Sequence, residues 1–104
     1  MADLTQTEWQ EQLENDSDAV IIDVRTLAEI QQGFIPKAIY IDIYKGQEFI
    51  NEVMKLDKNK SYYVYCRSGG RSGQACAFMK QAGFEKAFNL MGGFTQWQGE
   101  ITYN

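Results

Sequence analysis

The chain contains no histidine, two cysteines and one proline among its 104 residues. Zinc sites and Cys-His catalytic pairs require histidine or several cysteines, so we expect neither a metal site nor such a pair within this chain. Any reactive thiol must therefore be activated by something other than imidazole.

The sequence also lacks a long apolar run. No stretch approaches the roughly 18 uninterrupted apolar residues of a membrane-spanning helix, and residues 1–6 lack the basic and apolar regions of a signal peptide. The formal net charge of −4 supplies no overall positive field that would attract polyanions. These features predict a cytoplasmic protein whose partners include neither nucleic acid nor a membrane surface.

The sequence does contain alternating strand-like and helix-like segments. A length of 104 residues with 44% hydrophobic content suits one compact domain, and we expect residues 1–104 to form it. The strand candidates are apolar runs without period-two alternation, which is typical of buried parallel strands. They predict an α/β domain with a mostly parallel central sheet of four to five strands and helices on both faces. The expected strands cover residues 19–22, 38–41, 62–65 and 87–90.

Capping boxes and helical spacing predict the helices. Thr5 with Glu8 and Thr26 with Glu29 each form a Thr-x-x-Glu capping box, the signature of a helix start. Other helices are expected where apolar residues recur at i, i+3, i+4 and i+7. The expected helices cover residues 6–15, 27–33, 49–54, 71–82 and 94–98.

The most informative segment is the loop between the expected strand at 62–65 and the helix at 71–82. Ligands of open α/β sheets bind beyond the carboxyl ends of the strands, which is where this loop would lie. Two glycines allow successive N–H groups to converge into an anion-binding nest, while the helix N-terminus and two arginines add positive charge. We call residues 66–72 the cysteine loop; it reads Cys66-Arg67-Ser68-Gly69-Gly70-Arg71-Ser72.

These donors favour a thiolate at Cys66 over a thiol. We therefore expect the pKa of Cys66 to lie below the ordinary value of about 8.5 without a histidine base. The competing interpretation is that Cys66 merely ends a buried strand. The second cysteine, Cys76, lies ten residues away along a helix, at about 1.5 Å per residue, which exceeds the bridging limit of roughly 7 Å. We expect no internal disulfide and a partly buried, structural Cys76.

The cysteine loop resembles the active-site loop of rhodanese-domain sulfurtransferases. Two further segments resemble signatures of that family, in the same order and approximate spacing. One departure is Phe34, at a position before the Ile-Pro pair where the family often has histidine. The matching segments are Asp23-Val24-Arg25 with Glu29 and Gly33-Phe34-Ile35-Pro36-Lys37-Ala38, and Asn89-Leu90-Met91-Gly92-Gly93 with Trp97.

The resemblance implies a rhodanese-like three-layer fold and a thiosulfate sulfurtransferase activity. In that activity Cys66 takes sulfane sulfur from a small donor such as thiosulfate, holds it as a persulfide and passes it to cyanide, a thiol or a cysteine on another protein. It requires no metal and no organic cofactor. The residues implied in binding the donor are Arg67, Ser68, Gly69, Gly70, Arg71 and Ser72.

Two alternative functions remain open on the same fold. The cysteine loop also resembles the active-site loops of cysteine phosphatases and arsenate reductases. Those loops place five residues between the cysteine and the arginine, whereas four residues separate Cys66 from Arg71. In the rhodanese-like group that this chain resembles, the shorter loop is associated with sulfur substrates and the longer loop with phosphate or arsenate. The other alternative is a non-enzymatic module that carries sulfur for a partner protein.

Residues outside the cysteine loop are expected to have structural roles. Asp23 and Arg25 follow a central strand, and we expect them to form a polar network beneath the loop. Glu29 is already explained by its capping box, which argues against a role as catalytic acid. Phe94 and Trp97 are expected in the core.

Overall fold

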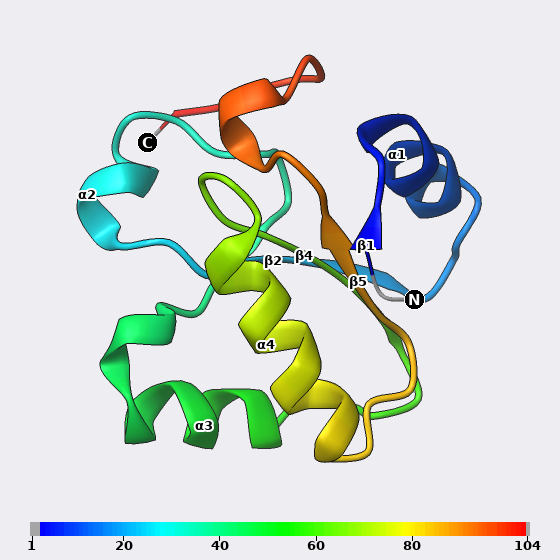
Figure 1. Cartoon of the computed structure of the whole chain (residues 1–104), viewed down its shortest axis with the longest axis vertical. Helices are drawn as coiled ribbons and strands as arrows, with labels where there is room; N and C mark the ends of the chain where they lie inside the picture. The colour runs from blue at the N-terminus through cyan, green and yellow to red at the C-terminus, as the bar shows by residue number, and fades with distance from the viewer. Residues whose placement is uncertain (1–2, 104) are drawn as a thin grey trace.

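The computed structural model describes residues 3–103, which form an α/β fold around a five-stranded sheet (Figure 1). The strand order is β1-β5-β4-β2-β3, and every neighbouring pair is parallel. The four expected strands are present, so the predicted fold class is confirmed. The strands are β1 Asp3–Leu4, β2 Ala19–Asp23, β3 Ile39–Tyr40, β4 Ser61–Tyr65 and β5 Ala87–Leu90.

The additional strand, β1, was not expected from the sequence. Its two residues pair with the end of β5, Asp3 opposite Asn89 and Leu4 opposite Leu90. A two-residue strand has too little sequence to show a period, and its partner lies more than eighty positions away along the chain. The strand nevertheless places Asp3 beside the carboxyl end of β5.

The helices begin where the capping boxes predict. The amide N–H of Glu8 donates to Thr5 Oγ1 over 3.2 Å, and that of Glu29 donates to Thr26 Oγ1 over 3.3 Å. The short helix expected over 94–98 is present as a single 3-10 turn, Phe94–Gln96, and is shorter than predicted because the backbone becomes extended at Trp97. The helices are α1 Gln6–Glu14, α2 Leu27–Ile30, α3 Gln47–Met54 and α4 Gly70–Gln81, with 3-10 turns η1 Ile43–Lys45 and η2 Phe94–Gln96.

Helices cover both faces of the sheet, α3 and α4 on one face and α1 with η2 on the other (Figure 1). All five residues of β4 are buried, because their side chains alternate between the two covered faces. Tyr62 and Val64 point toward α3 and α4, whereas Tyr63 and Tyr65 point toward α1. Side chains packed on both faces therefore hold the central strand in place up to its last residue, immediately before Cys66.

Trp9 of α1 anchors the second face. Its ring is 0% exposed, meets Tyr63, Tyr65 and Trp97 edge to face at centroid distances of 5.6 to 6.4 Å, and donates its indole N–H to the Phe88 carbonyl. This packing fixes α1 on the strands that lead to the cysteine loop.

We expect Trp9→Ala to lower the free energy of unfolding by about 3–5 kcal/mol, because it leaves a large cavity in a closed core. Urea unfolding followed by far-UV circular dichroism measures the loss. Met54→Ala is the matched control, since Met54 is 45% exposed and its removal should change the free energy by no more than about 0.5 kcal/mol. Equal losses in the two variants would contradict the central place of Trp9.

Candidate active site

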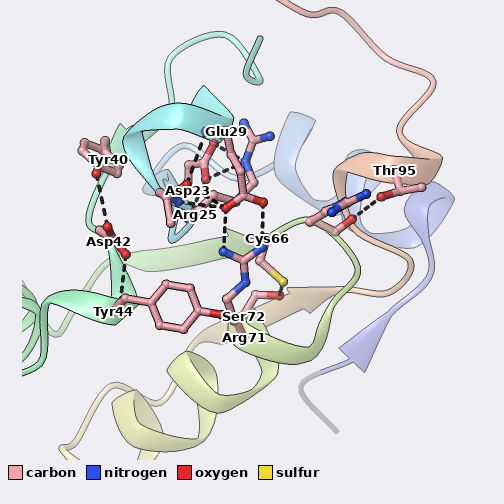
Figure 2. A network of polar contacts seen from close by, with 12 residues as sticks. Asp23, Arg25, Glu29, Tyr40, Asp42, Tyr44, Cys66, Arg71, Ser72 and Thr95 are labelled. Carbon is pink, nitrogen blue, oxygen red and sulfur yellow. Dashed lines mark hydrogen bonds and ion pairs between the residues drawn. The ribbon is translucent and has the colours of Figure 1, made fainter. Parts of the chain in front are cut away.

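Cys66 lies directly after the central strand β4, and the next helix, α4, begins at Gly70. The predicted strand–loop–helix setting is therefore confirmed. The Cys66 side chain is only 1% exposed, so its sulfur faces the interior of the loop (Figure 2). Any molecule that reacts with it must reach into the loop.

The cysteine loop curls so that hydrogen-bond donors surround the sulfur. The Gly69 N–H donates to Cys66 Sγ over 3.1 Å, and the Ser72 hydroxyl lies 3.3 Å from it. Gly69 has a φ of 106°, a conformation that side chains rarely adopt, so glycine is required there. The expectation that Gly70 also serves the curl was wrong: it begins α4 with ordinary backbone, and an added Cβ would meet nothing within 4 Å.

The segment after β5 holds the outer side of the loop. The Phe94 N–H donates to the Cys66 carbonyl over 2.9 Å, and Thr95 donates both its N–H and its hydroxyl to the Arg67 carbonyl (Figure 2). The C=O and N–H of a trans peptide point in opposite directions, so the contacts with the Arg67 carbonyl turn the N–H of Ser68 toward the sulfur. A Cβ on Gly93 would lie 2.5 Å from the Arg67 oxygen, so only glycine permits this close approach.

These donors lower the pKa of the Cys66 thiol. Burial raises the pKa, but the Ser72 hydroxyl and the N–H groups of Ser72, Gly69 and Ser68 together outweigh burial. The predicted direction is confirmed, and its main cause is the hydrogen bonds of the loop.

Arg71 is engaged elsewhere. Its two terminal nitrogens donate to the two carboxylate oxygens of Glu29 over 2.7 and 2.8 Å, and its guanidinium lies 5.4 Å from the Tyr44 ring centroid (Figure 2). Hydrogen bonds from Arg71 lower the pKa of Glu29 to about 2 against the opposing effect of burial, with Thr26 contributing further. Glu29 thus has a second role that its capping box did not reveal: it neutralises Arg71 and ties α2 to the cysteine loop.

Asp23 and Arg25 form the polar network expected beneath the loop. The Arg25 side chain donates to both Asp23 oxygens and to the Gly33 carbonyl, with both side chains almost fully buried. Its guanidinium also lies 4.2 Å from the Phe94 ring centroid. The network connects β2 to η2, the turn that holds the Cys66 carbonyl.

The remaining loop side chains and the second cysteine lie apart from the sulfur. Arg67 and Ser68 are exposed on the loop. Cys76 is 1% exposed, more buried than expected, and burial raises the pKa of its thiol to about 12. Both cysteines are free, so the expectation of no internal disulfide is confirmed.

Residues 3–103 contain neither a metal-binding cluster of side chains nor a helix that could span a membrane. In this part of the chain, no three or more cysteine, aspartate or glutamate side chains gather in a way that would hold a metal ion. The helices of the same residues are all too short or too polar to cross a membrane.

The geometry defines a class of protein: an α/β domain that presents a cysteine in a ring of N–H and O–H donors at the carboxyl end of its central parallel strand. Comparison with known proteins specifies the family. A family profile described as "Rhodanese-like domain" matches residues 5–100. The chain therefore belongs to the rhodanese-like domain family.

Relatives and solved structures agree with this assignment. A protein named "Sulfurtransferase" from Allochromatium vinosum is 38% identical over 87 residues, 84% of this chain and 78% of that protein. "Thiosulfate sulfurtransferase GlpE" from Pseudomonas savastanoi pv. phaseolicola is 32% identical over 89 residues, 86% of this chain and 81% of that protein. The crystal structure of a rhodanese-like domain protein from Staphylococcus aureus has a TM-score of 0.84 at 28% identity, covering 100% of this chain and 99% of the other.

We expect Ser72→Ala to raise the pKa of Cys66 by about one unit, because the thiolate loses a hydrogen bond from a hydroxyl. Ser68→Ala is the matched control, since Ser68 reaches the sulfur through its backbone N–H and its side chain is exposed. The ultraviolet absorbance of the thiolate against pH measures both values. A larger shift in Ser68→Ala than in Ser72→Ala would contradict the assignment of the donors.

We expect Glu29→Gln to lower the free energy of unfolding by about 1–2 kcal/mol at neutral pH, a range that allows for solvent screening of a carboxylate that is 25% exposed. The folded pKa of about 2 lies below the ordinary 4.5, so this stabilisation is present above pH 4.5 and is lost as pH falls toward 2. Urea unfolding of both proteins over that range measures the difference.

The matched control for this pH dependence is Glu52→Gln. Glu52 pairs with Lys55 on α3, but both side chains are more than half exposed, so the change should have little effect. If the free energies of unfolding of wild type and Glu29→Gln differ by the same amount down to pH 2, Glu29 does not stabilise the fold through its charge.

Proposed function

We propose that this protein is a sulfurtransferase of the thiosulfate type, in which Cys66 carries the transferred sulfur as a persulfide. The observation that carries the proposal is the setting of the Cys66 sulfur, which accepts hydrogen bonds from the Gly69 N–H and the Ser72 hydroxyl at the end of the central strand. The relative named thiosulfate sulfurtransferase supports the choice of donor.

In the first step, the Cys66 thiolate attacks the outer sulfur of thiosulfate. A sulfur–sulfur bond forms to Cys66, and the bond between the two sulfurs of thiosulfate breaks with its electron pair leaving on sulfite. The N–H groups of the loop and the positive end of α4 stabilise the negative charge throughout the exchange. The thiolate and the dianion yield a persulfide anion and sulfite, so charge is conserved.

In the second step, a thiophilic acceptor attacks the outer sulfur of the persulfide. Cyanide gives thiocyanate, while a thiolate on a small molecule or a protein gives a new persulfide. The bond to Cys66 breaks with its electron pair returning to that sulfur, so the Cys66 thiolate is regenerated. The low thiol pKa that favours attack in the first step also makes Cys66 a good leaving group in the second.

The other residues of the cysteine loop divide into two roles. The exposed side chains of Arg67 and Ser68 contact the donor as it approaches, and the donors of Gly69 and Ser72 act on the reacting sulfur. Arg71 acts on the shape of the loop through its pair with Glu29, whereas Gly70 is the first residue of α4. The four residues between Cys66 and Arg71 favour sulfur over phosphate, because a tighter nest suits a smaller reacting centre.

Thiosulfate treatment followed by intact-mass measurement tests the carrier step. We expect the wild-type protein to gain the mass of one sulfur atom, which a reductant removes, and Cys66→Ala to gain none. Cys76→Ala is the matched control and should load sulfur as the wild type does, because the Cys76 thiol is buried and its pKa is raised to about 12. Sulfur gain in Cys66→Ala and its loss in Cys76→Ala would overturn the assignment.

Turnover distinguishes the enzyme from its alternatives. Thiosulfate and cyanide together should yield thiocyanate with wild type and Cys76→Ala but not with Cys66→Ala. Sulfur loading without thiocyanate would instead indicate a carrier for a partner protein. Cys66-dependent hydrolysis of an aryl phosphate, without sulfur loading, would favour the phosphatase alternative.

A further inference from the structure

The Ser72 hydroxyl has two hydrogen-bond acceptors within reach and only one proton. It lies 3.3 Å from Cys66 Sγ and 2.5 Å from Asn89 Oδ1. A serine hydroxyl donates a single hydrogen bond, although its oxygen can accept others. At any moment, Ser72 can therefore donate to the sulfur or to Asn89, but not to both.

The Asn89 side chain is fixed with its oxygen toward Ser72. Its Nδ2 donates to Asp3 Oδ1 over 2.8 Å and to the Gly69 carbonyl over 3.1 Å. A carboxylate and a carbonyl only accept hydrogen bonds, so they require the NH₂ group on their side and leave Oδ1 to face the hydroxyl. Asn89 is 5% exposed on β5, which limits access of water to that oxygen.

The two directions of the Ser72 proton correspond to two states of the sulfur. When Cys66 is a thiol, Ser72 donates to Asn89, and its oxygen can accept the thiol S–H. When Cys66 is a thiolate, the charged sulfur attracts the Ser72 proton, and Asn89 Oδ1 loses its donor. A buried acceptor without a donor costs free energy, which opposes formation of the thiolate.

We propose that Asn89 is a positioning residue that competes with Cys66 for the single hydroxyl proton of Ser72, so that the hydroxyl turns from Asn89 to Cys66 when the sulfur becomes negatively charged. The proposal rests on the proposed function in that it takes Cys66 as the reacting thiol. Asn89 thereby limits the thiolate fraction of free protein, while Gly69 and the loop N–H groups favour it.

Other charged and titratable groups also face this site, and each must stay constant in a test. Glu29 lies on α2 and pairs with Arg71 of α4, and Arg67 lies on the loop itself. Cys76 of α4 is electrostatically coupled to Cys66. On β1, Asp3 accepts from Asn89. Substitutions at positions 72 and 89 leave all these groups in the protein.

A double-mutant cycle between positions 72 and 89 isolates the competition. Asn89→Leu replaces the amide by an apolar group of the same shape. The Gly69 carbonyl keeps its bond from the Gly73 N–H, and the exposed Asp3 carboxylate can be solvated. The readout is the pKa of Cys66, from thiolate absorbance against pH, for wild type, each single variant and the double variant.

We expect Asn89→Leu to lower the pKa of Cys66 by about half a unit, because Ser72 no longer has a second acceptor. In the Ser72→Ala background, the same substitution should leave the pKa unchanged. Ser72→Thr, which retains a hydroxyl, should restore the effect of Asn89→Leu. A pKa that rises in Asn89→Leu, or shifts equally in both backgrounds, would overturn the proposal, because a general disturbance of the loop does not require the hydroxyl.

A second measurement leaves Asn89 in place, so it does not depend on the stability of Asn89→Leu. The side-chain carbonyl carbon of Asn89, followed by NMR, should change its chemical shift with the midpoint of the Cys66 titration, and this change should vanish in Ser72→Ala. Asn51 on α3, whose side-chain oxygen accepts from Gln47, serves as the internal reference. An Asn89 signal that does not follow the Cys66 titration would refute the switch.

Neither measurement uses a sulfur donor. If the double-mutant cycle gives the expected result but Cys66 does not gain sulfur from thiosulfate, only the proposed function is rejected. If Cys66 gains sulfur but the cycle does not give the expected result, only the competition for the Ser72 proton is rejected.

Discussion

A negative charge on a buried sulfur has to be stabilised in a chain without histidine. The Cys66 side chain is 1% exposed, and burial by itself raises the pKa of its thiol. The N–H groups of the cysteine loop and the Ser72 hydroxyl reverse that effect, and much of the surrounding structure holds these donors in place. The 93–95 segment orients the peptide planes, the Glu29–Arg71 pair ties the loop to α2, and Asn89 holds the Gly69 carbonyl.

The parallel sheet brings these supports together from distant parts of the sequence. Carboxyl ends of parallel strands meet at one edge, so β2, β4 and β5 deliver Asp23, Cys66 and Asn89 to the same side of the molecule. The three residues have different roles. Cys66 is the reacting group, Asn89 contacts the Ser72 hydroxyl beside it, and the Asp23–Arg25 pair supports the turn that holds the loop carbonyls. The side chain of Arg71, by contrast, is directed to Glu29 and contributes to the shape of the loop.

Features determined by local sequence could be predicted, whereas those determined by long-range pairing could not. The two capping boxes, the four expected strands and the strand–loop–helix setting of Cys66 depend on neighbours in the chain, and the structure contains all of them. The Arg71–Glu29 pair joins residues 42 positions apart, and Asn89 reaches Asp3 across 86. Gly70 shows a different limit: a glycine pair indicates a turn, but it does not indicate which of the two glycines has the left-handed backbone, and in the structure that glycine is Gly69.

The short strand β1 has a consequence for how this protein is handled in the laboratory. When Cys66 is a thiol, Asp3 connects to its sulfur through Asn89 and Ser72, in a row of three hydrogen bonds. A tag or fusion partner placed next to Asp3 therefore lies only a few hydrogen bonds from the nucleophile, however far it extends into solvent. Kinetic comparisons between preparations that differ in what is attached next to Asp3 would then report on the attachment as well as on the protein.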